Sequence, residues 1–123
     1  MRDNLERLRD IQEAIAQIMK YTNQGRDTFD QNELVQAWAV RHLEIIGEAA
    51  RAISQDFKNN HPEIQWGQIN GMRNVLIHAY FQINLDRVWS AVEDDLPILK
   101  TSIDVILNTE GNTLAEGDHH NVS

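Results

Sequence analysis

Residues 73–80 read Arg-Asn-Val-Leu-Ile-His-Ala-Tyr and place four polar side chains among apolar neighbours. Arg73 offers a permanently charged, planar fork that fits phosphate oxygens. His78 can give or take a proton near pH 7, Asn74 carries an amide that can orient a neighbour, and Tyr80 carries a phenol. An imidazole and a guanidinium can split an RNA backbone without a metal ion or other cofactor, because the imidazole moves protons and the guanidinium neutralises the phosphorane.

The spacing of this stretch limits how its side chains can cooperate. Arg73 and Tyr80 are seven residues apart and share a helix face, whereas Arg73 and His78 are five apart and diverge by about 140° on an ideal helix. One straight helix therefore cannot aim both at one phosphate. Either the helix ends or distorts near His78, or a second protomer completes the site and brings a second Arg73.

The Arg-x4-His-x-Tyr spacing resembles the signature of the HepT-like branch of the HEPN superfamily. The surrounding sequence strengthens the resemblance: residues 41–50 read RHLEIIGEAA, residues 61–66 HPEIQW, residues 71–74 GMRN, residues 85–89 LDRVW and residues 95–97 DLP. These blocks follow the order of the family and cover most of residues 3–107. Gln65 departs from the pattern, since many relatives carry a second proline there.

The resemblance implies an all-α, up-and-down bundle of four to five helices that forms a symmetric homodimer. It implies a toxin of a two-gene toxin–antitoxin module, acting as a metal-independent endoribonuclease on RNA. Arg73 and His78 would be catalytic, with Asn74 and Tyr80 in support. The family's partner is a minimal nucleotidyltransferase (MNT) antitoxin, which would neutralise the toxin by transferring AMP onto Tyr80.

Composition restricts the class of protein. A chain of 123 residues fits one domain, lacks cysteine and has no apolar run long enough to span a bilayer. These features favour a cytoplasmic protein. The net charge of −8 argues against RNA binding, which normally relies on Lys and Arg. It therefore favours an alternative: a non-catalytic helical module that docks a nucleotidyltransferase and holds a nucleotide or phosphate near Arg73.

Helical periodicity extends over most of the chain. Apolar residues three and four apart predict helices over residues 3–21, 28–58, 66–79 and 84–107, with Asp30 or Thr28 capping the second and Asn84 the last. Pro97 predicts a kink or a restart of the last helix after Asp94 and Asp95. Residues 1–108 are thus expected to form the helical domain, and residues 109–123, poor in apolar side chains, a disordered tail.

The second predicted helix carries two distinct faces. Its apolar arc comprises Val35, Trp38, His42, Ile45, Ile46, Ala49 and Ile53. The opposite side holds Arg41, Glu44, Glu48 and Arg51, which could line a site or form a solvated stripe of ion pairs; the second interpretation is the stronger default. His42 is expected to be a hydrogen-bonded core or interface residue, and His61 a loop or cap residue.

Overall fold

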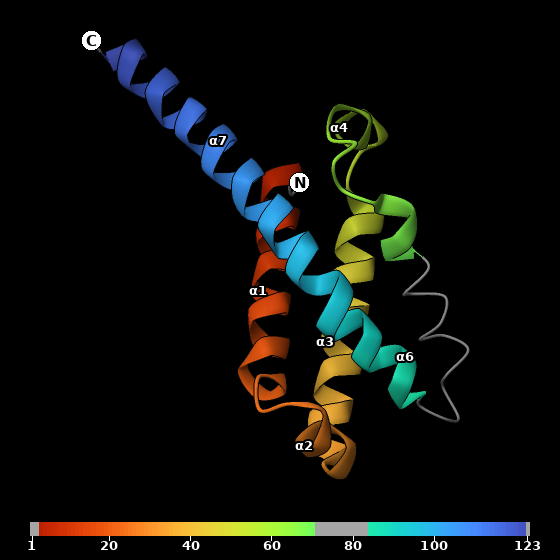
Figure 1. Cartoon of the computed structure of the whole chain (residues 1–123). Coiled ribbons are helices and arrows are strands. Elements are labelled where there is room, and N and C mark those ends of the chain that lie inside the picture. Colours follow the sequence, from red (N-terminus) through yellow and green to blue (C-terminus); the bar gives the residue numbers. More distant parts are fainter. Residues whose placement is uncertain (1–2, 71–83, 123) are drawn as a thin grey trace.

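The computed structural model describes residues 3–70 and 84–122, and all regular structure within them is helical. α1 (Asn4–Thr22) runs down, α2 (Arg26–Gln31) turns the chain, and α3 (Glu33–Ala52) runs back up to α4 (Gln55–Asn60). Residues 66–70 form one helical turn. The chain then returns upward through α6 (Leu85–Ser90), the π-helical segment η1 (Ala91–Asp95) and α7 (Leu96–Val122), as Figure 1 shows. The predicted all-α, up-and-down bundle is confirmed.

The core lies where α1, α3 and α7 meet. Its completely or almost completely buried large side chains come from four helices: Leu8, Ile11, Ile15, Ile18, Phe29, Leu43, Ile46, Leu96 and Ile103. On α1 these residues recur at steps of three and four, which is the spacing of one helix face. Two polar contacts support this packing, since Gln12 Nε2 donates to Asp104 Oδ1 on α7 at 2.7 Å and Trp38 Nε1 donates to the Gln17 carbonyl at 2.7 Å.

The prediction of one helix over residues 28–58 is wrong, because the chain breaks at Asn32 and again at Ile53 and Ser54. Asn32 has extended backbone angles, and its side chain accepts from the amides of Leu34 and Val35 at 3.0 and 3.2 Å. Ser54 caps α4 by accepting from the Phe57 amide at 3.2 Å. Both residues are N-caps that stop one helix and start the next.

The buried face of α3 is also rotated relative to the predicted apolar arc. Val35, Ile46, Ala49 and Ile53 are buried as predicted, whereas Trp38, His42 and Ile45 are only half-buried. Ala39, Leu43 and Ala50 take the central positions instead. Small residues allow α1 to approach closely, and the aromatic rings with polar atoms then lie at the edge of the contact.

The last helical region begins at Asn84 as predicted, since the Asn84 side chain accepts from the Arg87 amide at 3.1 Å. The predicted restart after Asp94 and Asp95 is present, since η1 ends at Asp95 and α7 begins at Leu96. Upstream of it, hydrogen bonding has the π pattern over Ala91–Asp95, where the Leu96 amide donates to the Ala91 carbonyl. A π turn leaves some groups without the usual α-helical partner, which suits the missing N–H of a nearby proline.

α7 continues to Val122, through the residues for which the composition predicts a disordered tail, and its distal part extends beyond the other helices (Figure 1). The predicted domain end at residue 108 also falls inside this helix. Disorder of the tail in solution stays a prediction, because an isolated helical extension is marginally stable in water.

Candidate functional site

The predicted site residues Arg73, Asn74, His78 and Tyr80 lie outside the described residues. The structure instead describes what holds the two ends of this stretch. One end is the turn at residues 66–70, and the other is Asn84 with α6 (Figure 1). The attachment of these two ends to the bundle therefore restricts where the predicted site residues can lie.

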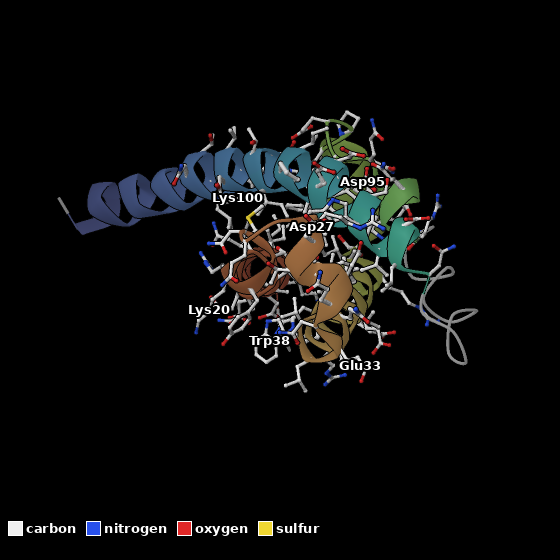
Figure 2. All side chains as sticks on the ribbon, turned by 60° about the horizontal axis from the view of Figure 1, so that its bottom comes forward. Lys20, Asp27, Glu33, Trp38, Asp95 and Lys100 are labelled. Atoms are coloured by element: carbon white, nitrogen blue, oxygen red, sulfur yellow. The ribbon has the colours of Figure 1, made fainter. Side chains whose placement is uncertain are left out.

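The turn before residue 71 is fixed by apolar and polar contacts. Ile64 and Ile69 are buried, with exposed fractions of 3% and 2%. The Trp66 Nε1 donates to the His61 carbonyl at 3.0 Å, and Gln68 Nε2 donates to Asp95 Oδ1 on η1 at 2.8 Å. Burial and the nearby Asp94 charge raise the pKa of Asp95, against the opposing influence of Arg87 and Gln68. This end of the stretch is thus attached to η1 through Asp95, which Figure 2 labels.

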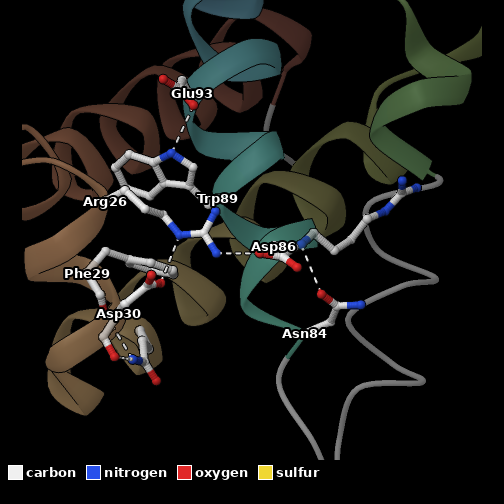
Figure 3. Close-up of polar contacts among 9 residues, drawn as sticks. Arg26, Phe29, Asp30, Asn84, Asp86, Trp89 and Glu93 are labelled. Carbon is white, nitrogen blue, oxygen red and sulfur yellow. Dashed lines mark hydrogen bonds and ion pairs between the residues drawn. The ribbon is translucent and has the colours of Figure 1, made fainter.

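The other end is held by the polar cluster drawn in Figure 3. Arg26 on α2 bonds to Asp30 through Nε at 2.8 Å and to Asp86 on α6 through Nη2 at 2.5 Å. The Asp86 and Asp30 hydrogen bonds raise the pKa of Arg26 above its ordinary value. Asp86, in the first turn of α6, therefore joins α6 to α2.

Apolar and aromatic contacts lie beneath this cluster. The rings of Phe29 and Trp89 are 5.2 Å apart and tilted by 40°, while Trp89 Nε1 donates to Glu93 at 2.9 Å. Val88 is buried beside them. Because Phe29 is completely buried and Asp86 is well exposed, packing does more than the ion pair to hold α6, since surface ion pairs are screened by water.

His61 joins the loop after α4 to the distal part of the bundle. Its Nδ1 lies 2.9 Å from Glu63 Oε1, its Nε2 lies 2.8 Å from Glu110 Oε1 on α7, and its side chain is only 15% exposed. Burial lowers the pKa of His61, but the hydrogen bonds and charges of Glu63 and Glu110 outweigh it and raise that pKa overall. The same His61 contact, followed by a backbone hydrogen bond, lowers the pKa of Glu63.

An open hollow of about 450 Å³ lies between α4 and the turn at residues 66–70. Its walls combine one cation, one indole, three carboxamides and small or apolar groups: Gln55, Lys58, Asn59, Pro62, Ile64, Trp66, Gly67 and Asn70. Lys58 Nζ lies 5.7 Å from the centre of the Trp66 ring. Helical periodicity gives no sign of this hollow, because its lining comes from two segments that meet only after folding.

The charged stripe of α3, His42 and His61 have the structural roles that their positions in the sequence predict. Arg41 and Glu44 form an exposed ion pair at 3.9 Å. His42 Nδ1 lies 2.8 Å from the Trp38 carbonyl, with its ring 4.3 Å from the Trp38 ring, so the predicted hydrogen-bonded role is confirmed. His61 is a helix cap as predicted, with the two carboxylate partners in addition. Within the described part of the chain, no group of three or more Asp, Glu and His side chains is placed to hold a metal ion.

Comparison with known proteins identifies the relatives of this bundle. A family model described as "Ribonuclease HepT-like" matches residues 11–106. The chain belongs to the HepT-like family. It is 42% identical over 100 residues to "Probable ribonuclease HepT" of Thermococcus cleftensis, covering 80% of this chain and 91% of that protein. It is 35% identical over 100 residues to "Putative RNase MJ1380" of Methanocaldococcus jannaschii, covering 80% and 92%.

The HepT-like match includes both attachment points and the stretch between them, since residues 66–70 and 84–90 lie inside the matched range. No solved structure matches the chain. None of the helices in the described parts of this HepT-like chain is long and apolar enough to cross a membrane. The family of the relatives, together with their names, supports a ribonuclease activity.

Proposed function

We propose that this HepT-like protein is a metal-independent endoribonuclease and the toxin of a toxin–antitoxin pair in the cytoplasm. Arg73 stabilises the phosphorane, His78 acts as general acid or base, and Asn74 supports them. The family match over residues 11–106, which contains the complete Arg-x4-His-x-Tyr spacing, is the observation that carries the proposal.

Attack by the 2′-hydroxyl of the RNA on its own adjacent phosphorus forms the new P–O bond. The bond to the 5′-oxygen breaks, leaving a 2′,3′-cyclic phosphate and a 5′-hydroxyl. One proton leaves the 2′-hydroxyl and one joins the departing oxygen, which are both transfers that an imidazole can assist. The guanidinium of Arg73 stabilises the additional negative charge in the transition state.

A symmetric homodimer supports this chemistry for a geometric reason. Arg73 and His78 diverge by about 140° on an ideal helix, so a groove between two protomers offers each phosphate an Arg73 and a His78 from different chains. The groove would also contain two Arg73 side chains. In a chain with net charge −8, such concentration of cations favours RNA binding.

We further propose that a minimal nucleotidyltransferase antitoxin neutralises the toxin by transferring AMP onto Tyr80. The added phosphate is negative and the nucleoside is bulky, so the modified side chain would occupy the Arg73 groove and repel RNA. The acidic net charge favours one alternative, a non-catalytic module that docks the nucleotidyltransferase and holds a nucleotide or phosphate.

Cleavage of end-labelled RNA in excess EDTA tests the proposal. Wild-type protein should cut and leave cyclic-phosphate ends, whereas Arg73→Ala and His78→Ala should lose at least a hundredfold in rate, the scale of general acid–base and electrostatic catalysis. His42→Ala serves as the matched histidine control. Cutting that survives both substitutions would point to a contaminant, and the absence of cutting by unmodified wild type would favour the docking module.

A further inference from the structure

The hollow beside Trp66 differs in composition from the acidic chain around it. Of the described residues that line it, none is acidic, although the chain contains 19 Asp and Glu residues. The lining instead combines the Lys58 ammonium, the Trp66 indole and the carboxamides of Gln55, Asn59 and Asn70. A volume of about 450 Å³ falls within the range of ligand-binding clefts, about 300–1,000 Å³.

We infer that this hollow binds an unpaired base of single-stranded RNA, with Lys58 on the adjoining phosphate. The inference deepens the proposed function, since it supplies a substrate subsite beside the Arg73 stretch. Aromatic rings hold bases of any identity by stacking, and carboxamides can bond to base edges. A lysine nearby supplies the positive charge that the backbone requires.

Trp66 is suited to this role because its ring is held in place. Its Nε1 donates to the His61 carbonyl at 3.0 Å, and the ring is half-buried against the core. Lys58 Nζ lies 5.7 Å from the ring centre in a half-buried contact, and a cation–π contact of about 0.5–2 kcal/mol is no stronger than the stacking of a base, about 1–3 kcal/mol. A base can therefore replace the ammonium on the ring, and the flexible lysine can then reach the phosphate.

Chain connectivity places the hollow near the proposed catalytic stretch. Asn70 lines the hollow, and Arg73 follows three residues later, so the two Cα atoms are at most about 11 Å apart in any conformation. A base bound at Trp66 and a phosphate bound by Arg73 can thus belong to one short stretch of RNA. Figure 1 shows that the turn leading to residue 70 lies on the outside of the bundle, below α4.

The test measures the binding of a fluorescein-labelled RNA octamer with 2′-fluoro groups, which cannot be cut because it lacks the 2′-hydroxyl nucleophile. Fluorescence anisotropy should show that Trp66→Leu weakens binding about tenfold. Lys58→Gln should weaken it less and reduce its dependence on salt. The chain offers a matched control pair, because Lys20 also lies over an aromatic ring, 5.5 Å from the centre of Tyr21. Lys20→Gln and Tyr21→Leu should leave the affinity unchanged.

A second set of variants, at Gly67, keeps the test decisive if Trp66→Leu does not fold. Gly67 lines the hollow, and a Cβ added there meets no atom within 4 Å, so a side chain can be introduced at this wall without a clash at its Cβ. Gly67→Glu should weaken RNA binding about tenfold, Gly67→Gln should weaken it less, and Gly67→Lys should strengthen it. Equal affinities across this series and Trp66→Leu would overturn the subsite. Competition by free AMP as effective as that by the octamer would assign the hollow to mononucleotides and also overturn it.

Cleavage of natural RNA, measured on the same preparations, separates this inference from the proposed function. Binding of the octamer through Trp66 without cleavage of RNA would support the subsite and contradict the proposed ribonuclease activity. Cleavage of RNA with the same KM by wild type, Trp66→Leu and Gly67→Glu would support the ribonuclease activity and contradict the subsite.

Discussion

His61 Nε2 lies 2.8 Å from Glu110 Oε1 and thereby joins the loop after α4 to α7 across 49 positions of the sequence. The pKa of His61 is raised overall, so the protonated form is the one that the fold stabilises. A raised histidine pKa contributes stability that is complete below the ordinary value of 6.5 and is lost as the pH rises through the raised value. The contact is therefore strongest in mildly acidic solution.

Replacing His61 by Gln should destabilise the protein more at pH 6 than at pH 9. At pH 6 the variant loses charge-assisted hydrogen bonds, and we expect a loss of about 1–2 kcal/mol in the free energy of unfolding. Urea unfolding at both pH values measures the difference. Glu44→Gln, at the exposed ion pair of α3, is the control and should leave the pH dependence unchanged. An identical loss at both pH values would contradict the role of the protonated imidazole.

Truncation should reveal that Glu110 belongs to the domain. A chain that ends at residue 108 lacks Glu110 and should lose stability at pH 6, whereas a chain that ends at residue 112 keeps the contact and should unfold like the full chain. The same experiment tests the tail, because a disordered segment contributes little to the unfolding transition. Equal destabilisation of both truncations would instead assign a packing role to residues 113–123.

Two neighbouring residues of α7 should respond very differently to truncation of the side chain. Leu96 is completely buried and Ile98 is 69% exposed. Leu96→Ala should cost about 2–5 kcal/mol in the free energy of unfolding, because it leaves a cavity in the hydrophobic core. Ile98→Ala should cost less than about 0.5 kcal/mol. Thermal or urea unfolding of the two variants in parallel checks the assignment of the buried face.

The break between α2 and α3 should depend on the Asn32 cap. Asn32→Ala removes the acceptor for two amides of the first turn of α3 and should cost about 1 kcal/mol in the free energy of unfolding. Asn32→Asp retains an acceptor and should restore most of the stability. Gln31→Ala, at the exposed neighbouring residue, should be nearly neutral. A neutral Asn32→Ala would contradict the cap.

The proposed transfer of AMP onto Tyr80 can be assigned to one residue, because the chain contains only two tyrosines, Tyr21 and Tyr80. After co-expression with a minimal nucleotidyltransferase and ATP, intact-mass spectrometry should detect one added AMP per chain. Tyr80→Phe should abolish the addition, and Tyr21→Phe should not affect it. Addition that persists in Tyr80→Phe would assign the modification to another residue and remove the proposed role of Tyr80.

The sequence predicts the bundle well because each long helix buries one apolar face. α1 and the Asn84 cap follow from spacing and side-chain type, as does His42 bonded within its own helix. The breaks at Asn32 and Ser54 are missed, because apolar residues continue across them and obscure the capping side chains. The sequence does contain a signal for η1. Val88, Val92 and Leu96 are four residues apart and all buried, although on an ideal α-helix two such steps would rotate the side chain by about 80° away from the core.

Contacts between distant residues are the part of the site that spacing cannot predict. The pairing of His61 with Glu110 and the hollow beside Trp66 arise only after the helices pack, and neither has a local pattern. The chemistry assigned to Arg73, Asn74, His78 and Tyr80 stays a prediction, since these residues lie outside the described part of the chain. Family membership makes that prediction specific, and the cleavage assay decides it.

The π turn over Ala91–Asp95 sets the rotation of α6 relative to α7 about their shared helix axis. Upstream of it lie Asn84 and Asp86, which fix the exit from residues 71–83, and downstream lies the buried face of α7. One residue corresponds to about 100° of rotation in a helix. Deleting a single residue between 91 and 95 would remove the extra residue of the π turn and leave α6 and α7 as one α-helix in nearly the same phase. Adding one residue there would instead leave α7 seated in the core while turning Asn84 and Asp86 by about 100°, away from Arg26. The angular setting of the whole candidate site thus depends on the length of a five-residue segment that contributes no chemistry.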